Sequence, residues 1–233
     1  MICFQAQDRW SNKNTIIFIR MKSFVCIALI LSLAFAKTHM IFQITDIHVE
    51  PDYRKGAPTV CENKPCCRKD SVPTNGTYPA PIYGDHHCDN SPEFFVDSLY
   101  YLREFFESHP NLKPDYIITT GDEATHRKYT TQTPELNVEL VRYVYTHLKD
   151  VFGDYKIIPS FGNHDTYPEG KMALPPENQW MTDVMVDLWK SWIPEDQIEN
   201  VRYGGYYTME VCIILIFWVY MVITRSNLVC ALW

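Results

Sequence analysis

The chain has 233 residues, of which 46% are hydrophobic, and a formal net charge of −7. This length and composition indicate one globular domain with short additions. The negative charge and the lack of a long Lys/Arg run exclude a nucleic-acid polymer as an expected partner.

The beginning of the chain predicts an export signal ahead of the folded domain. Residues 1–20 are interpreted as an N-terminal extension. Residues 21–36 predict a signal peptide, because a basic start and an apolar segment precede the small residues Ala34 and Ala36 of a cleavage site. An uncleaved N-terminal anchor is the alternative. We therefore expect a secreted, extracellular or lysosomal protein.

From residue 40 onward, predicted strands alternate with predicted helices. Short apolar runs predict strands at 40–45, 116–120 and 155–159. Apolar positions at helical spacing, two of them after Ser-Pro-Glu or Thr-Pro-Glu starts, predict helices at 91–108, 133–151 and 182–192. This alternation predicts an α/β fold with a mostly parallel sheet flanked by helices.

Residues 51–90 predict an irregular loop stapled by disulfides. Four cysteines fall within 28 residues of this segment: Cys61, Cys66, Cys67 and Cys88. In an oxidising compartment they favour two bridges. Cys66 and Cys67 are adjacent and are not expected to pair with each other, which leaves two connectivities. A zinc knuckle that includes His86 and His87 is the alternative; otherwise these two histidines are interpreted as surface or structural residues.

Two further segments carry weaker signals. Asn75-Gly76-Thr77 is a glycosylation sequon in a Pro- and Gly-rich stretch, so Asn75 is a candidate glycosylation site. Residues 209–233 are interpreted as an apolar tail, with thirteen uninterrupted apolar residues from Val211 to Ile223. A buried strand, a poor membrane anchor and a spuriously translated end are the three interpretations of that run.

Three short polar clusters each follow an apolar run where a strand should end. They are Asp46-Ile47-His48, Gly121-Asp122 and Gly162-Asn163-His164-Asp165. Ligands gather at the carboxyl ends of the strands in a parallel sheet, so we expect the three clusters at one rim.

The residue types in these clusters suit a two-metal phosphoester site. Asp46 and His48 can direct an oxygen and a nitrogen at one cation. Asp122 can bridge two cations, and Asn163 offers a neutral amide oxygen. Such mixed ligation suits Zn²⁺, Mn²⁺ or Fe, and two such ions would bind the phosphate and generate a metal-bound hydroxide for in-line attack.

The third cluster also offers an acid. His164, next to Asn163, is free to hydrogen-bond the phosphoryl group or to protonate the leaving oxygen. We expect Asp165 to orient His164, as carboxylates often do for functional histidines.

In combination, the clusters resemble the calcineurin-like metallophosphoesterase superfamily and, more closely, the acid sphingomyelinase-like phosphodiesterases. The narrower resemblance rests on four features: the Gly-Asp-x-x-x-His spacing that ends at His126, the cysteine segment from Cys61 to Asp89, Leu188-Trp189-Lys190-Ser191-Trp192, and Gly204-Gly205-Tyr206-Tyr207-Thr208. It covers roughly residues 40–208, so residues 37–208 are predicted to be the N-terminal part of a phosphoesterase domain.

The resemblance implies a zinc-dependent hydrolase of sphingomyelin, other phosphocholine-type lipids or nucleotide phosphodiesters. It implies that Asp46 and His48 bind one zinc ion, that Asp122 bridges two, and that Asn163 binds the second. It places His164 and His126 near the leaving group, although a satisfied surface histidine is the alternative for His126. It also implies the pairs Cys61–Cys66 and Cys67–Cys88.

One departure from the resemblance is large. The family takes three more metal-binding histidines from later segments, whereas no histidine follows His164 in this chain. We therefore expect a partial metallophosphoesterase sandwich whose C-terminal half is missing, with weakly bound metal, low activity and poor folding.

The partners follow from the chemistry. We expect a small-molecule or lipid phosphodiester substrate, with a membrane surface as a further candidate partner, and a monomer. An inactive secreted glycoprotein fragment is one alternative function. A phosphomonoesterase of the same superfamily is another, ranked lower because no tyrosine follows Asp122 until Tyr129.

Overall fold

The computed structural model describes residues 39–128, 131–212 and 215–219. Residues from Met40 onward belong to one unit, to which the statements below apply. The N-terminal extension, the predicted signal peptide and residues 220–233 of the tail lie outside the described residues. Within the described part, no helix combines the length and the apolar character needed to span a bilayer. The elements of regular structure are β1 Ile41–Ile44, α2 Pro92–Ser108, the 3₁₀ turn η1 Pro110–Leu112, β2 Tyr116–Thr119, α3 Pro134–Phe152, β3 Lys156–Ile158, α4 Gln179–Trp189, the 3₁₀ turn η2 Glu195–Gln197, α5 Ile198–Gly204, β4 Tyr207–Cys212 and β5 Leu215–Val219.

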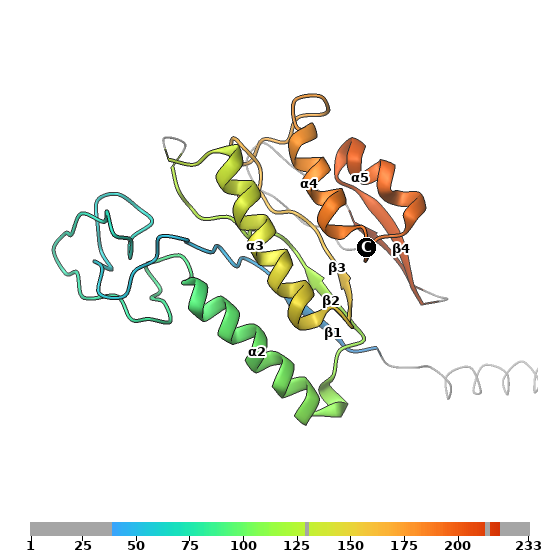
Figure 1. Ribbon diagram of the computed structural model, residues 1–233, viewed down its shortest axis with the longest axis horizontal. Helices are drawn as coiled ribbons and strands as arrows, with labels where there is room; N and C mark the ends of the chain where they lie inside the picture. Colours follow the sequence, from blue (N-terminus) through green and yellow to red (C-terminus); the bar gives the residue numbers. More distant parts are fainter. Residues whose placement is uncertain (1–38, 129–130, 213–214, 220–233) are drawn as a thin grey trace, which may run out of the picture. The chain divides into compact units, whose positions relative to one another are not determined.

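A three-stranded parallel sheet forms the centre of this unit, in the order β1-β2-β3. Ile41 of β1 pairs with Tyr116 of β2, and Tyr116 pairs in turn with Lys156 of β3. Long connections that contain α2 and α3 return the chain to the start of each next strand (Figure 1). The predicted α/β fold is confirmed, and all three predicted strands are present.

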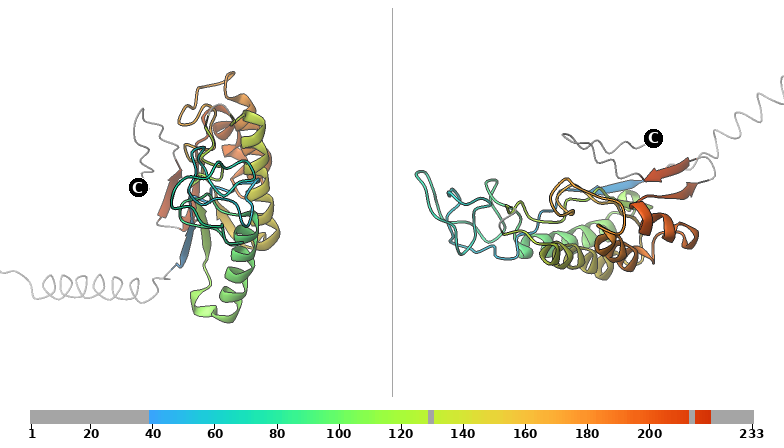
Figure 2. Two further views of the ribbon diagram at one scale, coloured as in Figure 1. Left: turned by 90° about the vertical axis from the view of Figure 1, so that its left-hand side faces the viewer. Right: turned by 90° about the horizontal axis from the view of Figure 1, so that it is seen from above.

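The helices α2, α3 and α4 cover one face of this sheet (Figures 1 and 2). The first two begin where the sequence predicts. Ser91 accepts a hydrogen bond from the Phe94 amide at the start of α2, and Thr133 accepts one from the Leu136 amide at the start of α3. In both helices a proline at the first turn supplies a preset backbone angle and lacks an amide that would need a partner.

The core lies between the sheet and the helices. Ile117 and Ile157 on neighbouring strands are fully buried, as is Phe152 at the end of α3. Trp189 of α4 is also fully buried, and its ring packs edge-on against that of Tyr145 from α3. The aromatic side chains at helical spacing are therefore mainly core residues.

The third predicted helix was wrong by three residues at each end. The structure has α4 from Gln179 to Trp189 instead of 182–192. The backbone amide of Trp192 bonds back to the Trp189 carbonyl in a turn, so the chain leaves the helix and buries Trp192 beside Tyr145. Apolar spacing alone does not distinguish this turn from a further helical turn.

The chain beyond α4 forms a short helix, α5, which the sequence did not predict, and the antiparallel pair β4–β5. The Tyr207 hydroxyl donates to the Pro159 carbonyl at 2.8 Å, which places the start of β4 beside the end of β3. The apolar run from Val211 thus continues β4 and enters β5, whereas residues 213–214 and 220–223 of it lie outside the described residues.

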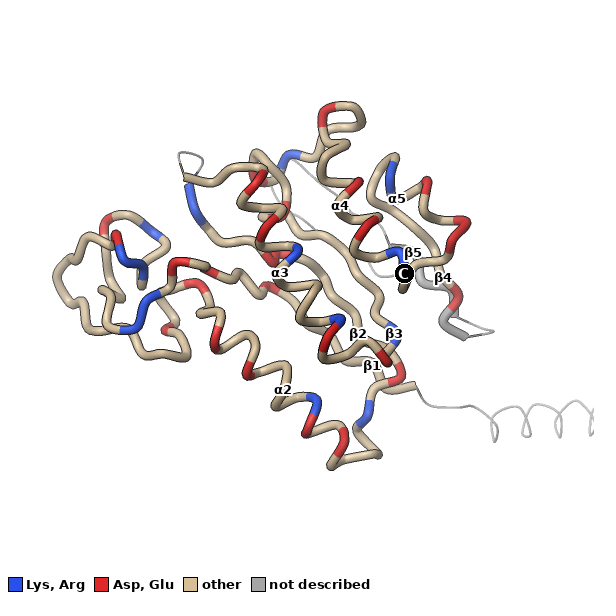
Figure 3. The backbone as a smooth tube through the Cα atoms, viewed as in Figure 1, with Lys and Arg blue, Asp and Glu red and all other residues tan. Residues whose placement is uncertain are grey.

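Residues 51–90 contain no helix or strand and are held by turns and two disulfides, as expected. The bridges are Cys61–Cys66 and Cys67–Cys88, which confirms the implied pairing. Because all four cysteines are paired, the alternative of a zinc knuckle is wrong. Asn75 lies in an exposed turn of this loop. Across the described residues, basic side chains are interspersed with acidic ones instead of gathering on one element (Figure 3).

Candidate active site at the carboxyl ends of the strands

The loop after β1 is held in an unusual backbone conformation. Asp46 and His48 have positive φ angles of 54° and 41°, which non-glycine residues rarely adopt. Their amides donate to the carbonyls of Gly121 and Asp122 at 3.1 and 2.9 Å. These bonds tie the first predicted cluster to the second and offset part of the backbone strain.

His48 is fixed in the tautomer that a metal ligand needs. Its Nδ1 lies 2.7 Å from the carbonyl oxygen of Ala124, and a carbonyl only accepts, so Nδ1 carries the proton. The lone pair of the neutral ring is therefore on Nε2, which lies 3.7 Å from Oδ1 of Asp46. A backbone carbonyl behind a histidine in this way is typical of metal-binding histidines.

The second and third clusters approach each other closely, and two glycines permit this. A Cβ atom on Gly121 would lie 1.8 Å from the amide nitrogen of Gly162. A Cβ atom on Gly162 would lie 2.0 Å from Oδ1 of Asp122. Both distances are far below contact distance, so larger residues at either position would push the loops apart.

Asp165 joins the two loops. Its carboxylate accepts hydrogen bonds of 2.8–3.0 Å from four backbone amides: those of Asp122, Glu123, Ala124 and Gly162. The expectation that Asp165 orients His164 was wrong, because both carboxylate oxygens are used by these amides. Instead, Nε2 of His164 lies 3.4 Å from Oε1 of Glu169.

Asp122 is a half-buried carboxylate next to the first cluster. Its Oδ1 accepts the His164 amide at 2.8 Å. Burial and the nearby charge of Asp165 raise the pKa of Asp122 to about 6. A cation beside it would reverse this trend, since an opposite charge favours the ionised carboxylate.

Asp46, His48 and Asp122 form a donor set of the kind that holds a metal. One ligand atom from each lies within 4.8 Å of those from the other two. Two carboxylate oxygens and one imidazole nitrogen match the mixed ligation of Zn²⁺, Mn²⁺ and Fe²⁺. The three residues therefore fit a divalent cation.

Asn163 is flanked by Gly162 and His164, which both lie against Asp122. Its backbone is therefore beside that carboxylate. Its carbonyl accepts the Gly170 amide and the Thr166 hydroxyl, both at 2.9 Å. These bonds hold the loop in which the predicted amide ligand sits.

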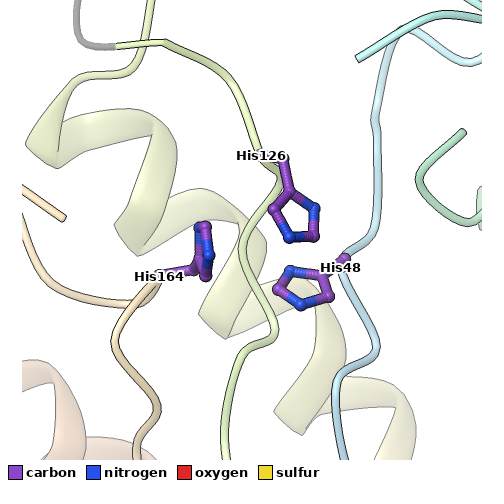
Figure 4. A group of neighbouring side chains, drawn as sticks. All are labelled: His48, His126 and His164. Carbon is purple, nitrogen blue, oxygen red and sulfur yellow. The ribbon is translucent and has the colours of Figure 1, made fainter. Parts of the chain in front are cut away.

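Three histidines from three different segments meet at this site, and one of them, His48, also belongs to the donor set (Figure 4). The ring centroids of His48 and His126 are 3.9 Å apart, those of His126 and His164 are 4.3 Å apart, and those of His48 and His164 are 4.9 Å apart. From the sequence, His126 and His164 were expected together near the leaving group and His48 at the metal, and contact among all three rings was not predicted.

His126 is both part of this cluster and half-exposed, with 47% of its side chain accessible. Its Nδ1 lies 2.7 Å from Oδ1 of Asp89, and its amide donates to Oδ2 of the same carboxylate at 2.7 Å. This hydrogen bond outweighs burial and raises the pKa of His126. For His164, burial and the neighbouring His126 lower the pKa.

Asp89 is a candidate positioning residue that sequence reasoning missed. It also accepts the Thr125 hydroxyl at 2.7 Å, and although burial opposes this, its hydrogen bonds hold its pKa below the ordinary value. Asp89 directly follows Cys88, at the end of the stapled loop. An aspartate next to a cysteine matches no sequence motif that would have predicted its contact with His126.

Sequence reasoning also missed an ion-pair network around Glu50 that connects two segments of the site. The fully buried Glu50 accepts hydrogen bonds from Arg127 and from the Thr125 hydroxyl, the latter at 2.9 Å. Arg127 also pairs with Asp52 at 2.6 Å. Since Glu50 follows the first cluster and Arg127 follows His126, this network fixes the two segments relative to each other.

Comparison with known proteins gives matches over most of the chain. The family model for calcineurin-like phosphoesterases matches residues 39–217, which extends past the predicted boundary at 208. The chain is 32% identical over 176 residues to sphingomyelin phosphodiesterase B of Dictyostelium discoideum, covering 75% of this chain and 27% of that protein.

Two animal proteins are also similar. The chain is 27% identical to the cyclic GMP-AMP phosphodiesterase of Bos taurus over 73% of this chain and 35% of that protein. It is 27% identical to the acid sphingomyelinase-like phosphodiesterase 3b of Homo sapiens over 74% of this chain and 35% of that protein. The chain thus spans about a third of the length of these relatives.

Proposed function

Because the chain belongs to the calcineurin-like phosphoesterase family, we propose that it forms one part of a metal-dependent phosphodiesterase centre of the acid sphingomyelinase-like type. The substrates are sphingomyelin, other phosphocholine-type lipids or nucleotide phosphodiesters, in keeping with the names of its relatives. The observation that carries the proposal is the donor set of Asp46, His48 and Asp122, whose ligand atoms lie within 4.8 Å at the ends of parallel strands.

Four residues would hold the metal, which we propose to be zinc. Asp46 and His48 would hold the first ion, Asp122 would be shared by both ions, and Asn163 would hold the second. When bound, two divalent cations lower the pKa of a water nucleophile and offset the charge of the phosphate. His48 presents Nε2 to this site because its Nδ1 is engaged by the Ala124 carbonyl.

His126 and His164 act on the leaving oxygen. The Asp89 carboxylate stabilises the protonated ring of His126, so that the ring is suited to donate a proton from Nε2. His164, whose pKa is lowered, is suited to hydrogen-bond the phosphoryl group as a neutral ring. Asp89 is a positioning residue here, since it acts through His126.

The cellular setting of the proposal follows from the loop. Two disulfides and the exposed Asn75 sequon suit a secreted or lysosomal glycoprotein, and we propose a monomer that meets its substrate in solution or at a membrane surface.

The test is to express the full chain, to measure zinc per chain by mass spectrometry, and to follow hydrolysis of bis(p-nitrophenyl) phosphate. We expect zinc-dependent turnover. Asp122→Asn should lose the zinc of this site and turnover together. Asp187→Asn, an exposed carboxylate paired with Arg142 on the helical layer, should change neither and is the matched control.

Two outcomes would contradict the proposal. If wild type and Asp122→Asn bind equal zinc, the donor set does not hold the metal. If zinc is bound at the site but neither bis(p-nitrophenyl) phosphate, sphingomyelin nor cyclic GMP-AMP is hydrolysed, the chain is the inactive form considered in the sequence analysis.

A further inference from the structure

A second group of metal-binding side chains lies in the stapled loop and has no role in the proposed reaction. Asp85, His86 and His87 are consecutive residues just before the Cys67–Cys88 bridge. One ligand atom from each lies within 4.8 Å of those from the other two. We propose that these three residues bind one divalent transition-metal ion, Zn²⁺ or Cu²⁺, at the protein surface.

Both rings face one carboxylate oxygen. Oδ1 of Asp85 lies 2.9 Å from Nδ1 of His87 and 3.6 Å from Nδ1 of His86. The ring centroids of the two histidines are 3.8 Å apart. Two imidazole nitrogens and one carboxylate oxygen therefore converge on a small volume.

A divalent ion fits this donor set. Without an ion, two neutral rings protonated on Nδ1 can donate to Oδ1, which also accepts the His87 amide at 3.0 Å. When deprotonated, the two Nδ1 atoms would instead offer their lone pairs to an ion beside Oδ1, and imidazole with carboxylate is a ligand set that zinc and copper accept.

The carboxylate is held in place by groups that do not bind the metal. The Asp85 side chain is only 8% exposed, and its Oδ2 accepts the Tyr78 hydroxyl at 2.7 Å. The Cys88 amide bonds to the Asp85 carbonyl at 2.9 Å, and Cys88 is bridged to Cys67. Outer hydrogen bonds and a covalent staple preorganise a site, which lowers the cost of binding.

The two rings are accessible to an ion from solvent. The side chains of His86 and His87 are 77% and 42% exposed. Three protein ligands on an open surface leave positions for water, so the bound ion exchanges readily and differs in this respect from a buried structural zinc. The site does not depend on the proposed hydrolytic function.

The experiment uses the full, disulfide-bonded chain titrated with Cu²⁺ and followed by electron paramagnetic resonance and calorimetry. In an Asp122→Asn background, which weakens the site at the strand ends, we expect one Cu²⁺ per chain with hyperfine splitting from two imidazole nitrogens. Changing both histidines, His86→Asn with His87→Asn, should abolish this signal. His109→Asn, which alters a histidine that stacks on Phe105, should leave it intact.

A further variant distinguishes a preorganised metal site from two exposed histidines that bind Cu²⁺ without one. Tyr78→Phe removes only the hydrogen bond to Asp85, and it should weaken Cu²⁺ binding by about tenfold to a hundredfold. An unchanged spectrum and stoichiometry in the double histidine variant would overturn the proposal. If the Asp122→Asn protein does not fold, the histidine double variant is compared with wild type instead. The double variant should then bind one Cu²⁺ per chain fewer than wild type, and equal binding would overturn the proposal.

Discussion

The sheet unit and the stapled loop are held together by different forces, and the candidate active site takes residues from both. Ile117, Ile157 and Phe152 in the sheet and its helices are fully buried, so hydrophobic burial stabilises that region. The loop of residues 51–90 has no helix or strand and relies on two disulfides and turns. The site is therefore only as well ordered as the weaker of the two regions.

The two regions also supply different residues to the site. The ends of the strands supply the proposed metal ligands through backbone geometry, with positive φ angles at Asp46, His48 and Asp122. The loop supplies Asp89, which holds His126. Variants that weaken only one region should therefore separate metal binding from the positioning of the acid.

The largest effect is expected at Asp165, in the sheet region. Replacing it with alanine leaves four backbone amides of the two loops without their acceptor, and each unsatisfied buried donor costs about 1–3 kcal/mol. We expect Asp165→Ala to lower the free energy of unfolding by about 4 kcal/mol or more. Denaturant unfolding in the presence of a chelator measures this without a contribution from bound metal.

The control for this prediction is Asp150→Ala, an exposed carboxylate on α3. It should change the free energy of unfolding by no more than about 0.5 kcal/mol. Equal effects at Asp150 and Asp165 would show that the amide hydrogen bonds do not stabilise the junction of the loops.

The next effect tests the loop. The Cys67–Cys88 bridge closes a loop with a sequence separation of 21 residues, and the Cys61–Cys66 bridge closes one of 5. Replacing both cysteines of either bridge with alanine opens that loop in the unfolded chain. Chain entropy then predicts losses of about 3 and about 2 kcal/mol. Hydrogen exchange should show faster exchange in residues 51–90 while the amides of β1–β3 stay protected. A uniform increase across the sheet would contradict the separation of the two regions.

Sequence reasoning reached the sheet part of the site more completely than the loop part. The clusters at Asp46, Asp122 and Asn163 follow predicted strands, and parallel pairing brings strand ends together whatever the surrounding side chains are. The helix starts were also readable, since Ser91 and Thr133 precede Pro-Glu and cap the helices.

The rest depended on tertiary contacts that leave no local pattern. Asp89 lies 37 residues before His126, and its role follows only from how the loop folds back on the strand ends. Asp165 was assigned to its sequence neighbour His164, whereas its partners are amides across the loop junction. Adjacency in sequence was a poor guide to the partners of these two carboxylates.

A smaller effect is expected from Asp89→Asn, which acts where the two regions meet. The hydrogen bonds of Asp89 hold its pKa below the ordinary 3.8, so its stabilisation is present above that pH and is lost as the pH falls through the folded-state value. We expect a loss of about 2 kcal/mol at pH 6, typical of hydrogen bonds to a buried charge. Between pH 5 and pH 2, the difference from wild type should shrink.

Urea unfolding at several pH values measures this, with Asp187→Asn as the exposed control. A difference that stays constant down to pH 2 would show that folding does not lower the pKa of Asp89. Zinc content should be unaffected by Asp89→Asn, because none of the proposed ligands contacts this carboxylate.

The smallest effect compares the two helix caps. Thr133 is exposed and caps only α3, so Thr133→Ala should cost about 1 kcal/mol. Ser91 is fully buried, caps α2 and also donates its hydroxyl proton to the Ile82 carbonyl of the loop at 2.8 Å. Ser91→Ala should therefore cost about 1 kcal/mol more than Thr133→Ala, because the loop carbonyl loses its partner as well. Thermal unfolding of both variants measures the difference, and equal losses would mean that the hydroxyl bond to Ile82 does not couple the loop to the helix layer.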